Sequence, residues 1–439
     1  MKNKISTNYW IFFFLLNISI MALRFSGVSI DYFAGNLFST AIFLVIFISL
    51  FYFFFTNKHD YFLMTWLSFY FASPIIKPYF LNIGALGILN LIFIPLMLLR
   101  SFNIKDKYFN VIILFMLVSI FNTADVNLRL IISKIFFFIA PFVFLNYARI
   151  KSESPTRVIK IAIAVALINL PLPIYEIIFH PVWGTAIDWR GVRIFGNLFW
   201  HNSYALFLMP TILILYFLTR QKFDFKKFFA LLILLVMEVL TLSRSSILSL
   251  FIGIVIIEWI YQDTKKISMK KILLVATLVF MIVLYFNIQP EIDTHLAPQA
   301  IQERTNIWKT ILPFIKSSLL MGNGIGSYEL YRDQILYSLS THNYYLAILF
   351  EMGLIGLVLT MSYVLFIILD LNRMNNISKY DSNLKLCKVG IAIIMVLLVD
   401  ALTGNSPFTQ VVSLNSWIIL GCLLNAGLKS KKENMRNLK

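Results

Sequence analysis

Hydrophobic residues occur along this chain in long continuous runs that short polar segments separate. The runs from Leu37 to Phe55 and from Ile272 to Phe286, for example, contain no charged residue. A helix satisfies its backbone polar groups internally, and about 20 apolar residues cross a bilayer, so these runs predict transmembrane helices. The alternation of apolar and polar positions that marks a membrane β-barrel is absent. The pattern predicts an all-α integral membrane protein, built as a polytopic helical bundle.

Fourteen apolar runs can be counted, near residues 8–24, 37–55, 61–76, 84–100, 109–122, 130–147, 157–179, 203–219, 228–243, 245–262, 272–286, 343–370, 387–403 and 411–427. Three of them, 61–76, 109–122 and 272–286, are short for a bilayer, and any of these three could be re-entrant. We therefore expect 12–14 transmembrane helices. The first run resembles a signal peptide, but Arg24 ends it and no small-residue cleavage site follows, which favours a retained span.

Composition supports this class and removes others. Hydrophobic residues make up 59% of the 439 positions and charged residues only 13%, which is outside the range of soluble globular domains. The formal net charge of +17 comes from basic residues spread over short loops, so it does not indicate a nucleic-acid partner. Cys387 and Cys422 both fall at or inside apolar runs, which excludes a disulfide framework and a CxxC site.

The distribution of lysine and arginine predicts the orientation. With the amino terminus in the cytoplasm, 27 of the 38 basic residues lie in cytoplasmic segments, ten lie in outer segments, and Lys134 lies within a span. Cytoplasmic loops of membrane proteins carry an excess of lysine and arginine. Both termini are therefore expected in the cytoplasm, and the basic loop clusters are expected to act as topology determinants beside anionic lipid.

Two outer loops are long, and the second of them, residues 287–341, is by far the longest connection. It mixes Trp308 and several tyrosines with glycine and proline, so we expect an ordered outer subdomain with short helices. The chain then divides into N-terminal transmembrane helices (1–179), an outer loop (180–202), central transmembrane helices (203–286), the large outer loop subdomain (287–341), C-terminal transmembrane helices (342–427) and a basic cytoplasmic tail (428–439).

Arginines on the outer side are exceptions to the orientation rule, and Arg244 is the exception placed deepest. It lies in the tight turn Leu242-Ser243-Arg244-Ser245-Ser246 between two apolar runs. A charge at that depth is costly unless it is paired. Arg244 is therefore either an interface anchor whose head group reaches water or part of an anion site, since guanidinium binds phosphate bidentately.

Two further outer arginines, Arg190 and Arg193, precede a span in a segment that also contains Gly196. Glycine lets the backbone approach a ligand, and the arginines suit a phosphate or a sugar. Alternatively, either arginine pairs with Asp188 or Glu176. In the large outer loop, Arg304 belongs to an expected helix running towards Lys316, where the plain interpretation is a solvated charge beside Glu303.

His342 and Asn343 stand at the outer start of a long predicted span. A histidine there exchanges protons near neutral pH and suits a catalytic base, although interface histidines are often simple amphipathic anchors. The metal-binding HExxH, the phosphate-binding GxxxxGKS and the nucleophile motif GxSxG are missing, and Glu291, Asp293 and His295 make only a weak metal candidate. We expect no metal and no cofactor.

Several of these elements follow one another in order along the chain: Arg193 to Gly196 and His201-Asn202 before a span, Ser243-Arg244 at a hairpin, Arg304 with Trp308, the run Gly322-x-Gly-x-Gly326, and His342-Asn343. Together they resemble the O-antigen ligase and O-antigen polymerase superfamily. His342-Asn343, nine residues and Gly353-x-x-Gly356 is similar to the ligase signature. The resemblance covers roughly residues 185–360.

The resemblance implies a GT-C-like membrane glycosyltransferase in the bacterial inner membrane. Its donor would be an undecaprenyl-pyrophosphate-linked oligosaccharide, used at the periplasmic face without metal. Arg193, Arg244 and Arg304 match the family's positions for stabilising the diphosphate, and His342 matches the histidine that activates or positions the acceptor hydroxyl. Arg190, His201, Asn202 and Asn343 are expected to bind substrate.

Within the superfamily, a ligase transfers the glycan to lipid A core, whereas a polymerase transfers the growing chain to another lipid-linked repeat unit. The arginine-x10-glycine motif of some polymerases is absent, because His201, Tyr204 and Ile315 stand where glycine is needed. We expect a polymerase, since polymerases are the more numerous and divergent members, with a chain-length regulator as a further partner. The alternative from another class is a flippase of lipid-linked oligosaccharides, in which Lys134, Glu351 and Asp400 would line the path.

Overall fold

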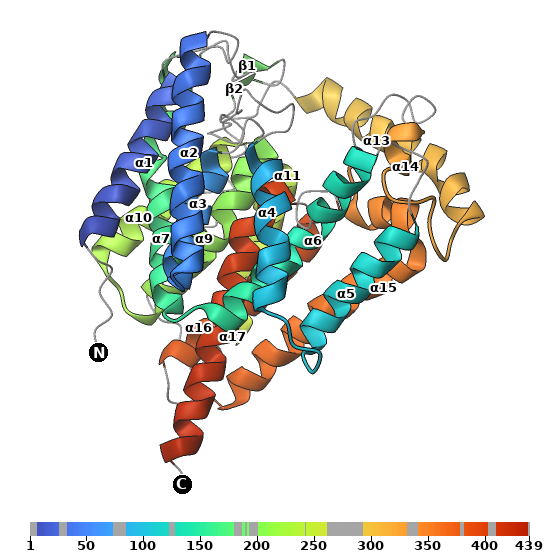
Figure 1. The fold of residues 1–439 in the computed structure, drawn as a ribbon. Coiled ribbons are helices and arrows are strands. Elements are labelled where there is room, and N and C mark those ends of the chain that lie inside the picture. Colours follow the sequence, from blue (N-terminus) through green and yellow to red (C-terminus); the bar gives the residue numbers. More distant parts are fainter. Residues whose placement is uncertain are drawn as a thin grey trace.

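The computed structural model describes residues 7–25, 33–72, 85–122, 128–179, 187–188, 191–192, 201–241, 243–260, 293–331, 341–377, 382–402 and 410–437. Its helices are α1 (Thr7–Phe25), α2 (Phe33–Phe55), α3 (His59–Ala72), α4 (Ala85–Arg100), α5 (Lys107–Phe121), α6 (Leu128–Lys151), α7 (Pro155–Ile168), α8 (Pro171–Phe179), α9 (His201–Gln221), α10 (Phe225–Leu240), α11 (Arg244–Ile260), α13 (Asp293–Ser317), α14 (Ser327–Leu330), α15 (Tyr344–Ile377), α16 (Ser382–Asp400) and α17 (Gln410–Asn437) (Figure 1).

A two-stranded antiparallel hairpin is the one departure from helix among these elements. Strand β1 (Ile187–Asp188) pairs with β2 (Gly191–Val192), with Ile187 opposite Val192 and Asp188 opposite Gly191. The rest of the regular structure in the described residues is helical. The all-α class predicted from the apolar runs is therefore confirmed for this part of the chain.

Most predicted spans coincide with one helix, and three predictions need comment. The run 157–179 is two helices, α7 and α8. Helix α7 ends at Ile168, the side-chain amide of its C-cap Asn169 donates to the carbonyl of Val165 at 2.7 Å, and Pro171 opens α8. The run 272–286 lies outside the described residues. The expected helix through Arg304 is present as α13, but it begins earlier, at Asp293.

Three helical segments of the described residues are long and apolar enough to cross a membrane by length and composition. They are Pro155–Tyr175, which runs from α7 into α8, Asn202–Gln221 and Tyr344–Met374. Shorter apolar helices cover Thr40–Phe55, Ile88–Arg100 and Lys107–Phe121. These helices and the apolar composition indicate a membrane protein. The count of 12–14 spans stays a prediction.

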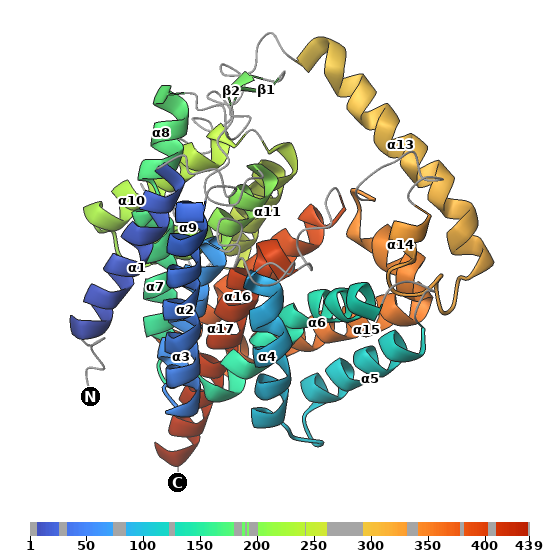
Figure 2. The same cartoon turned by 45° about the horizontal axis from the view of Figure 1, so that its top comes forward.

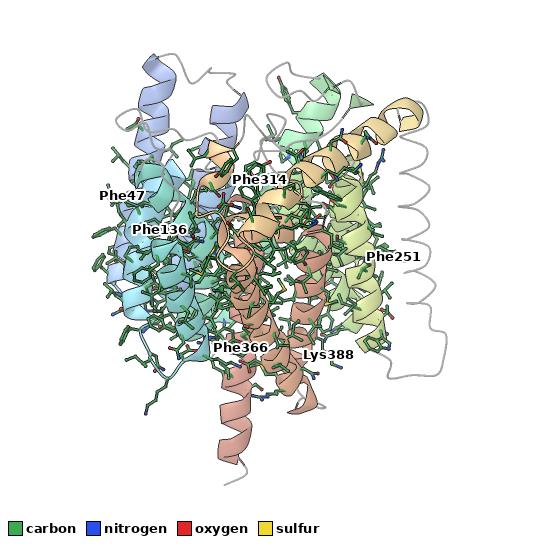
Figure 3. All side chains as sticks on the ribbon, turned by 90° about the vertical axis from the view of Figure 1, so that its right-hand side faces the viewer. Phe47, Phe136, Phe251, Phe314, Phe366 and Lys388 are labelled. Carbon is green, nitrogen blue, oxygen red and sulfur yellow. The ribbon has the colours of Figure 1, made fainter. Side chains whose placement is uncertain are left out.

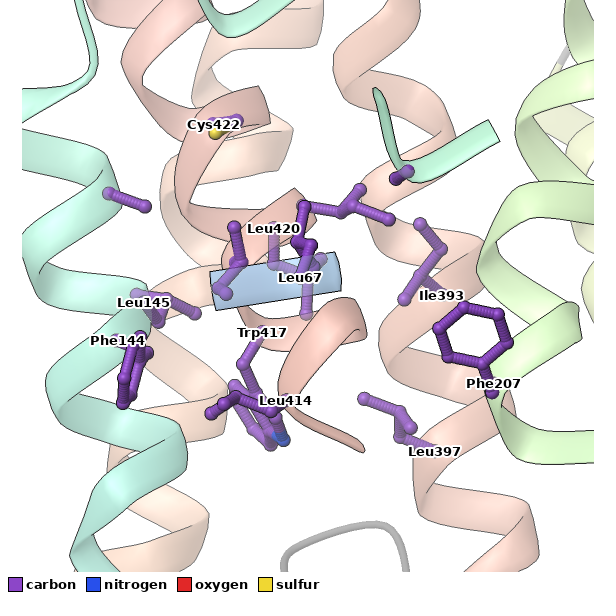
Figure 4. Close-up of a cluster of buried hydrophobic side chains, with 14 of the residues drawn as sticks. Leu67, Phe144, Leu145, Phe207, Ile393, Leu397, Leu414, Trp417, Leu420 and Cys422 are labelled. Carbon is purple, nitrogen blue, oxygen red and sulfur yellow. The ribbon is translucent and has the colours of Figure 1, made fainter. Parts of the chain in front are cut away.

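The helices bury a continuous apolar core and also present apolar side chains outward. Around Trp417, α17 packs against α6, with Phe144 and Leu145 facing Leu414 and Leu420 (Figure 4). A Cβ atom at Gly421 would meet the backbone of α6, so glycine permits this close approach. On α1, by contrast, Ile11, Leu15 and Ile18 follow helical spacing and are each more than half exposed. Such an exposed apolar stripe is typical of a lipid-facing helix.

Charged and polar residues tie the helices together at one end of the bundle, which we call the Asp370 end. The Lys107 ammonium and the Tyr108 hydroxyl each lie 2.8 Å from a carboxylate oxygen of Asp370 on α15. Arg149 on α6 pairs with Asp106, which also caps α5. Phe366 and Lys388 lie toward this end and Phe314 toward the other (Figure 3).

Asp60 organises the turn between α6 and α7 at the same end. It is buried and accepts hydrogen bonds from the Ser152 hydroxyl (2.8 Å), the Glu153 N–H (3.0 Å) and the Ser154 N–H (2.7 Å). Lys429 of α17 donates to the carbonyls of Ser152 and Glu153, at 2.9 and 2.7 Å. Lys429, one of the basic residues expected on the cytoplasmic side, thus also stabilises the turn between α6 and α7.

We predict that Asp60→Ala lowers thermal stability in detergent. Each buried N–H that loses its acceptor costs about 1–3 kcal/mol, so the unfolding midpoint followed by intrinsic fluorescence should fall clearly. Glu153→Ala is the matched control, because that side chain is exposed. Equal midpoints for the two variants would contradict the assigned role of Asp60.

Candidate functional site

The site is built around a break in α15. Gly353 has φ 63° and ψ −162°, which divides α15 into a half-helix of residues 344–352 and a long segment of residues 354–377. A break in an apolar helix frees backbone groups that lipid cannot satisfy, at several kcal/mol each. The partners of these groups therefore decide whether the break is stable.

Residues 318–326, which we call the glycine loop, supply those partners. The N–H groups of Asn323 and Gly324 donate to the carbonyls of Phe350 and Glu351, at 2.8 and 3.0 Å. On the other side of the break, the N–H groups of Leu354 and Ile355 donate to the carbonyls of Leu319 and Leu320, at 2.8 and 3.2 Å. The loop thus replaces the helical hydrogen bonds that α15 loses.

Glycine is required where the loop meets the break. Gly322, Gly324 and Gly326 have φ of 75°, 97° and 85°, a region that glycine enters without steric cost. A Cβ atom at Gly322 would stand 2.5 Å from the backbone nitrogen of Gly353, closer than any side chain allows. The glycine run and the first glycine of the Gly353-x-x-Gly356 pair are therefore in direct backbone contact with each other.

Two asparagines fix the glycine loop to its surroundings. Asn122, which ends α5, accepts from the Ile325 N–H (2.9 Å) and donates from its side-chain amide to the carbonyls of Met321 and Glu351. The side-chain amide of Asn323 donates to the carbonyl of Phe350 at 3.1 Å. Sequence reasoning did not single out Asn122, since a helix-ending asparagine is also an ordinary feature.

His342 and Asn343 precede the half-helix, and Asn343 and Tyr344 bind the two residues that follow α16. The Asn343 carboxamide oxygen accepts from the Leu346 N–H (3.0 Å), a helix N-cap, and its amide donates to the carbonyl of Leu402 (3.0 Å). The Tyr344 N–H donates to the carbonyl of Ala401, also at 3.0 Å. His342 is half-buried with φ 51°, a conformation that costs a non-glycine residue about 1–3 kcal/mol and that clusters at functional sites.

The hairpin with Arg244 reaches the same end of α16 from the other side. Asp400, the last residue of α16, is buried and accepts a long hydrogen bond from the Ser246 hydroxyl at 3.5 Å. The Ser243 hydroxyl donates to Ser246 at 2.8 Å, and Arg244 is exposed at the start of α11. The end of α16 therefore joins the Arg244 hairpin to the His342 segment, and we call this end of the bundle the His342 end.

Helix α13 brings Arg304 towards the same place. The Trp308 indole N–H donates to the carbonyl of Thr341 at 2.8 Å, directly before His342. Ile307, Ile311 and Ile315 form the buried stripe of α13 and pack with Tyr328 and Phe350 of α14 and α15. Arg304, half-buried, lies one turn before Trp308, so this packing determines its place. Figure 2 shows α13 along the edge of the molecule, with α14 between it and α15.

One acidic residue beside the hairpin escaped the sequence reasoning. Glu238, near the end of α10, is fully buried and interacts electrostatically with Asp400. Neither of its carboxylate oxygens has a hydrogen-bond partner among the described residues. The sequence feature that could have identified it is an acidic residue in an apolar run just before the outer turn.

Within the described residues, no three histidine, cysteine, aspartate or glutamate side chains form a metal site.

The structure thus joins the elements that carry four of the eight predicted site residues: Arg244, Arg304, His342 and Asn343. Asn202 is exposed in the first turn of α9, and none of the hydrogen bonds described above links it to the other four. Arg190, Arg193 and the side chain of His201 lie outside the described residues, as does the side chain of Glu176, so the proposed pairs of those arginines stay predictions.

The comparisons with known proteins agree with this region. A family model for the O-antigen ligases matches residues 229–361, from α10 to the long segment of α15. The match includes the Arg244 hairpin, α13, the glycine loop and the broken part of α15, and it confirms the resemblance to the O-antigen ligase and polymerase superfamily. No curated protein matches the chain.

We predict that Gly353→Ala impairs both stability and function. A Cβ atom there would collide with the backbone of Leu320 and Gly322 and would also hold an L-residue at positive φ. Gly390→Ala in α16 is the control, because its Cβ would meet the terminal methyl groups of Leu371 and Leu423, which can shift, and no backbone atom is among its nearest neighbours. The thermal unfolding midpoint and the amount of folded protein in membranes should fall far more for Gly353→Ala. Similar values for both variants would argue against the glycine contact.

Proposed function

We propose, from the match of residues 229–361 to the O-antigen ligase family, that the protein is a membrane glycosyltransferase. Its donor would be a glycan carried on undecaprenyl pyrophosphate and its acceptor a sugar hydroxyl. The observation that carries this proposal is the joining of the Arg244 hairpin and the His342 segment at one end of α16. A cationic group and a titratable base on two elements that meet the same end of α16 fit transfer from a diphosphate leaving group.

Positive charge at the His342 end suits the leaving group. Helices α9, α11 and α15 all begin at this end, and helix N-termini carry partial positive charge that favours anions. Arg244 and Arg304 add full charges. Fixed donors of this kind stabilise the charge that develops on the diphosphate in the transition state, a contribution often worth about 3–4 kcal/mol per donor. Arg190, Arg193, His201, Asn202 and Asn343 are proposed to hold the substrate.

The proposed reaction exchanges one bond of the anomeric carbon for another. The bond from that carbon to the pyrophosphate oxygen breaks, and its electron pair leaves with the undecaprenyl pyrophosphate. A new bond forms to the acceptor oxygen, whose proton goes to the imidazole of His342. A neutral histidine near pH 7 is suited to this role, and Asn343 fixes the backbone beside it.

The proposed setting is the bacterial inner membrane, with 12–14 spans in a GT-C-like arrangement and with both termini in the cytoplasm. The His342 end would then face the periplasm, where the glycan extends while the polyprenyl tail stays in the bilayer. Paired basic residues at the Asp370 end, such as Lys107 and Arg149, are consistent with a cytoplasmic position.

Arg244→Ala and His342→Ala are each expected to abolish glycan extension or attachment in cells, while the level of inserted protein stays normal. Loss of either group removes charge stabilisation or proton transfer, and each contributes at least about a hundredfold. Arg373→Ala is the control, because that arginine is highly exposed at the Asp370 end. Wild-type glycan in both site variants would contradict the proposed site.

Between the two activities of the superfamily we propose polymerase, acting with a chain-length regulator. Lipopolysaccharide gels of a strain lacking the protein test this choice. A core that carries one repeat unit indicates a lost polymerase. A core without repeats, together with accumulated lipid-linked polymer, indicates a lost ligase and would reverse the assignment.

A further inference from the structure

A lysine inside an apolar helix lies beside the break in α15. Lys134 belongs to α6, where Ile135 and Phe138 are buried neighbours. A charge within a membrane helix is costly unless it is paired. The ammonium nitrogen of Lys134 lies 3.3 Å from Oε1 of Glu329 and 3.9 Å from Oε1 of Glu351. One lysine of the bundle thus meets two carboxylates from two other elements, α14 and α15.

Glu351 is the buried member of this group. Its side chain is 5% exposed, against 25% for Lys134 and 39% for Glu329. It stands two residues before Gly353, and the backbone N–H groups of Gly326 and Tyr328 also interact with its carboxylate. The same side chain therefore connects α6, the end of the glycine loop and the half-helix. A buried carboxylate that loses its cationic partner is strongly destabilising.

Distance decides how Lys134 can affect the site. Glu351 is nine residues after His342, which is about 13 Å along a helix that rises about 1.5 Å per residue. A lysine paired at Glu351 is therefore too far from His342 to act on the same acceptor hydroxyl. It can act on His342 only through the half-helix that both ends share.

We propose that Lys134 is a positioning residue, which pairs with Glu329 and Glu351 to fix the break in α15 and so the direction of the half-helix that presents His342. This inference rests on the proposed function. The glycine loop holds the break by backbone hydrogen bonds to α15 itself. Lys134 instead fixes the position of the break relative to α6, which packs closely on α17 in the core. A displacement of about 1 Å at a reacting group costs about a hundredfold in rate.

Kinetics of the purified full-length protein in proteoliposomes test this proposal, with undecaprenyl-pyrophosphate-linked oligosaccharide as the substrate. Lys134→Ala is expected to lower kcat by about tenfold to a hundredfold with KM for the donor within about twofold. Lys134→Arg should retain most of kcat, because the charge is kept. Lys309→Ala, an exposed lysine of α13, is the control and should keep wild-type kinetics.

A charge exchange separates positioning from general loss of structure. Lys134→Glu should be nearly inactive, and adding Glu329→Lys should raise kcat at least about tenfold above that single variant, because the opposite charges meet again. Glu329→Gln is the mild variant if Lys134→Ala folds poorly. It removes only the more exposed partner and should lower kcat with KM unchanged.

The outcomes against the proposal are distinct. A raised KM with normal kcat in Lys134→Ala would make Lys134 a direct ligand of the donor. Wild-type kcat in Lys134→Ala and Glu329→Gln, or no gain from the charge exchange, would remove the positioning role. His342→Ala, measured in parallel, separates a failure of the proposed function from a failure of the Lys134 inference. Activity in that variant overturns the proposed function, whereas an inactive His342→Ala beside a fully active Lys134→Ala overturns only this inference.

Discussion

The backbone groups freed where α15 breaks at Gly353 need hydrogen-bond partners that lipid cannot supply, and the rest of the site follows from how they are provided. The glycine loop fills the break by pairing with residues on both sides of it. This pairing requires glycine at 322 and 353, since the two backbones touch. It also determines where the half-helix points and therefore where His342 stands. The need to satisfy backbone groups inside the membrane thus fixes the position of the half-helix that carries the site.

Each part of the site reaches this break through a different contact. Helix α13 is joined by Trp308 to Thr341, α5 by Asn122 to the glycine loop, and α16 by its last carbonyls to Asn343 and Tyr344. The buried Asp400 extends the connection to the Arg244 hairpin. Arg244 and Arg304 are in this way carried by elements that are joined to the His342 segment, and a lipid-pyrophosphate donor would bring its negative charge to this end of the bundle.

The sequence predicted the helices well because apolar runs depend only on local composition, and α9, α10 and α11 lie within a few residues of their runs. It treated 343–370 as one span, since a glycine within an apolar run is also compatible with a continuous helix. It identified the glycine run as a turn and Gly353 as part of a motif. The contact between them could not be derived, because it depends on the tertiary packing of segments about 30 residues apart along the chain. Asn122 and Glu238 were missed for the same reason.

The charge bias of the loops predicted that Arg244, Arg304 and His342 lie on one face of the membrane, and the structure joins the elements that carry them by specific hydrogen bonds. The central claim is that this face transfers a glycan from a lipid pyrophosphate. The most direct measurement is a reconstitution of the purified protein in liposomes with radiolabelled undecaprenyl-pyrophosphate-linked repeat units and no other protein. The account predicts longer lipid-linked glycans together with released undecaprenyl pyrophosphate. Movement of intact donor across the bilayer without any new glycosidic bond would contradict it.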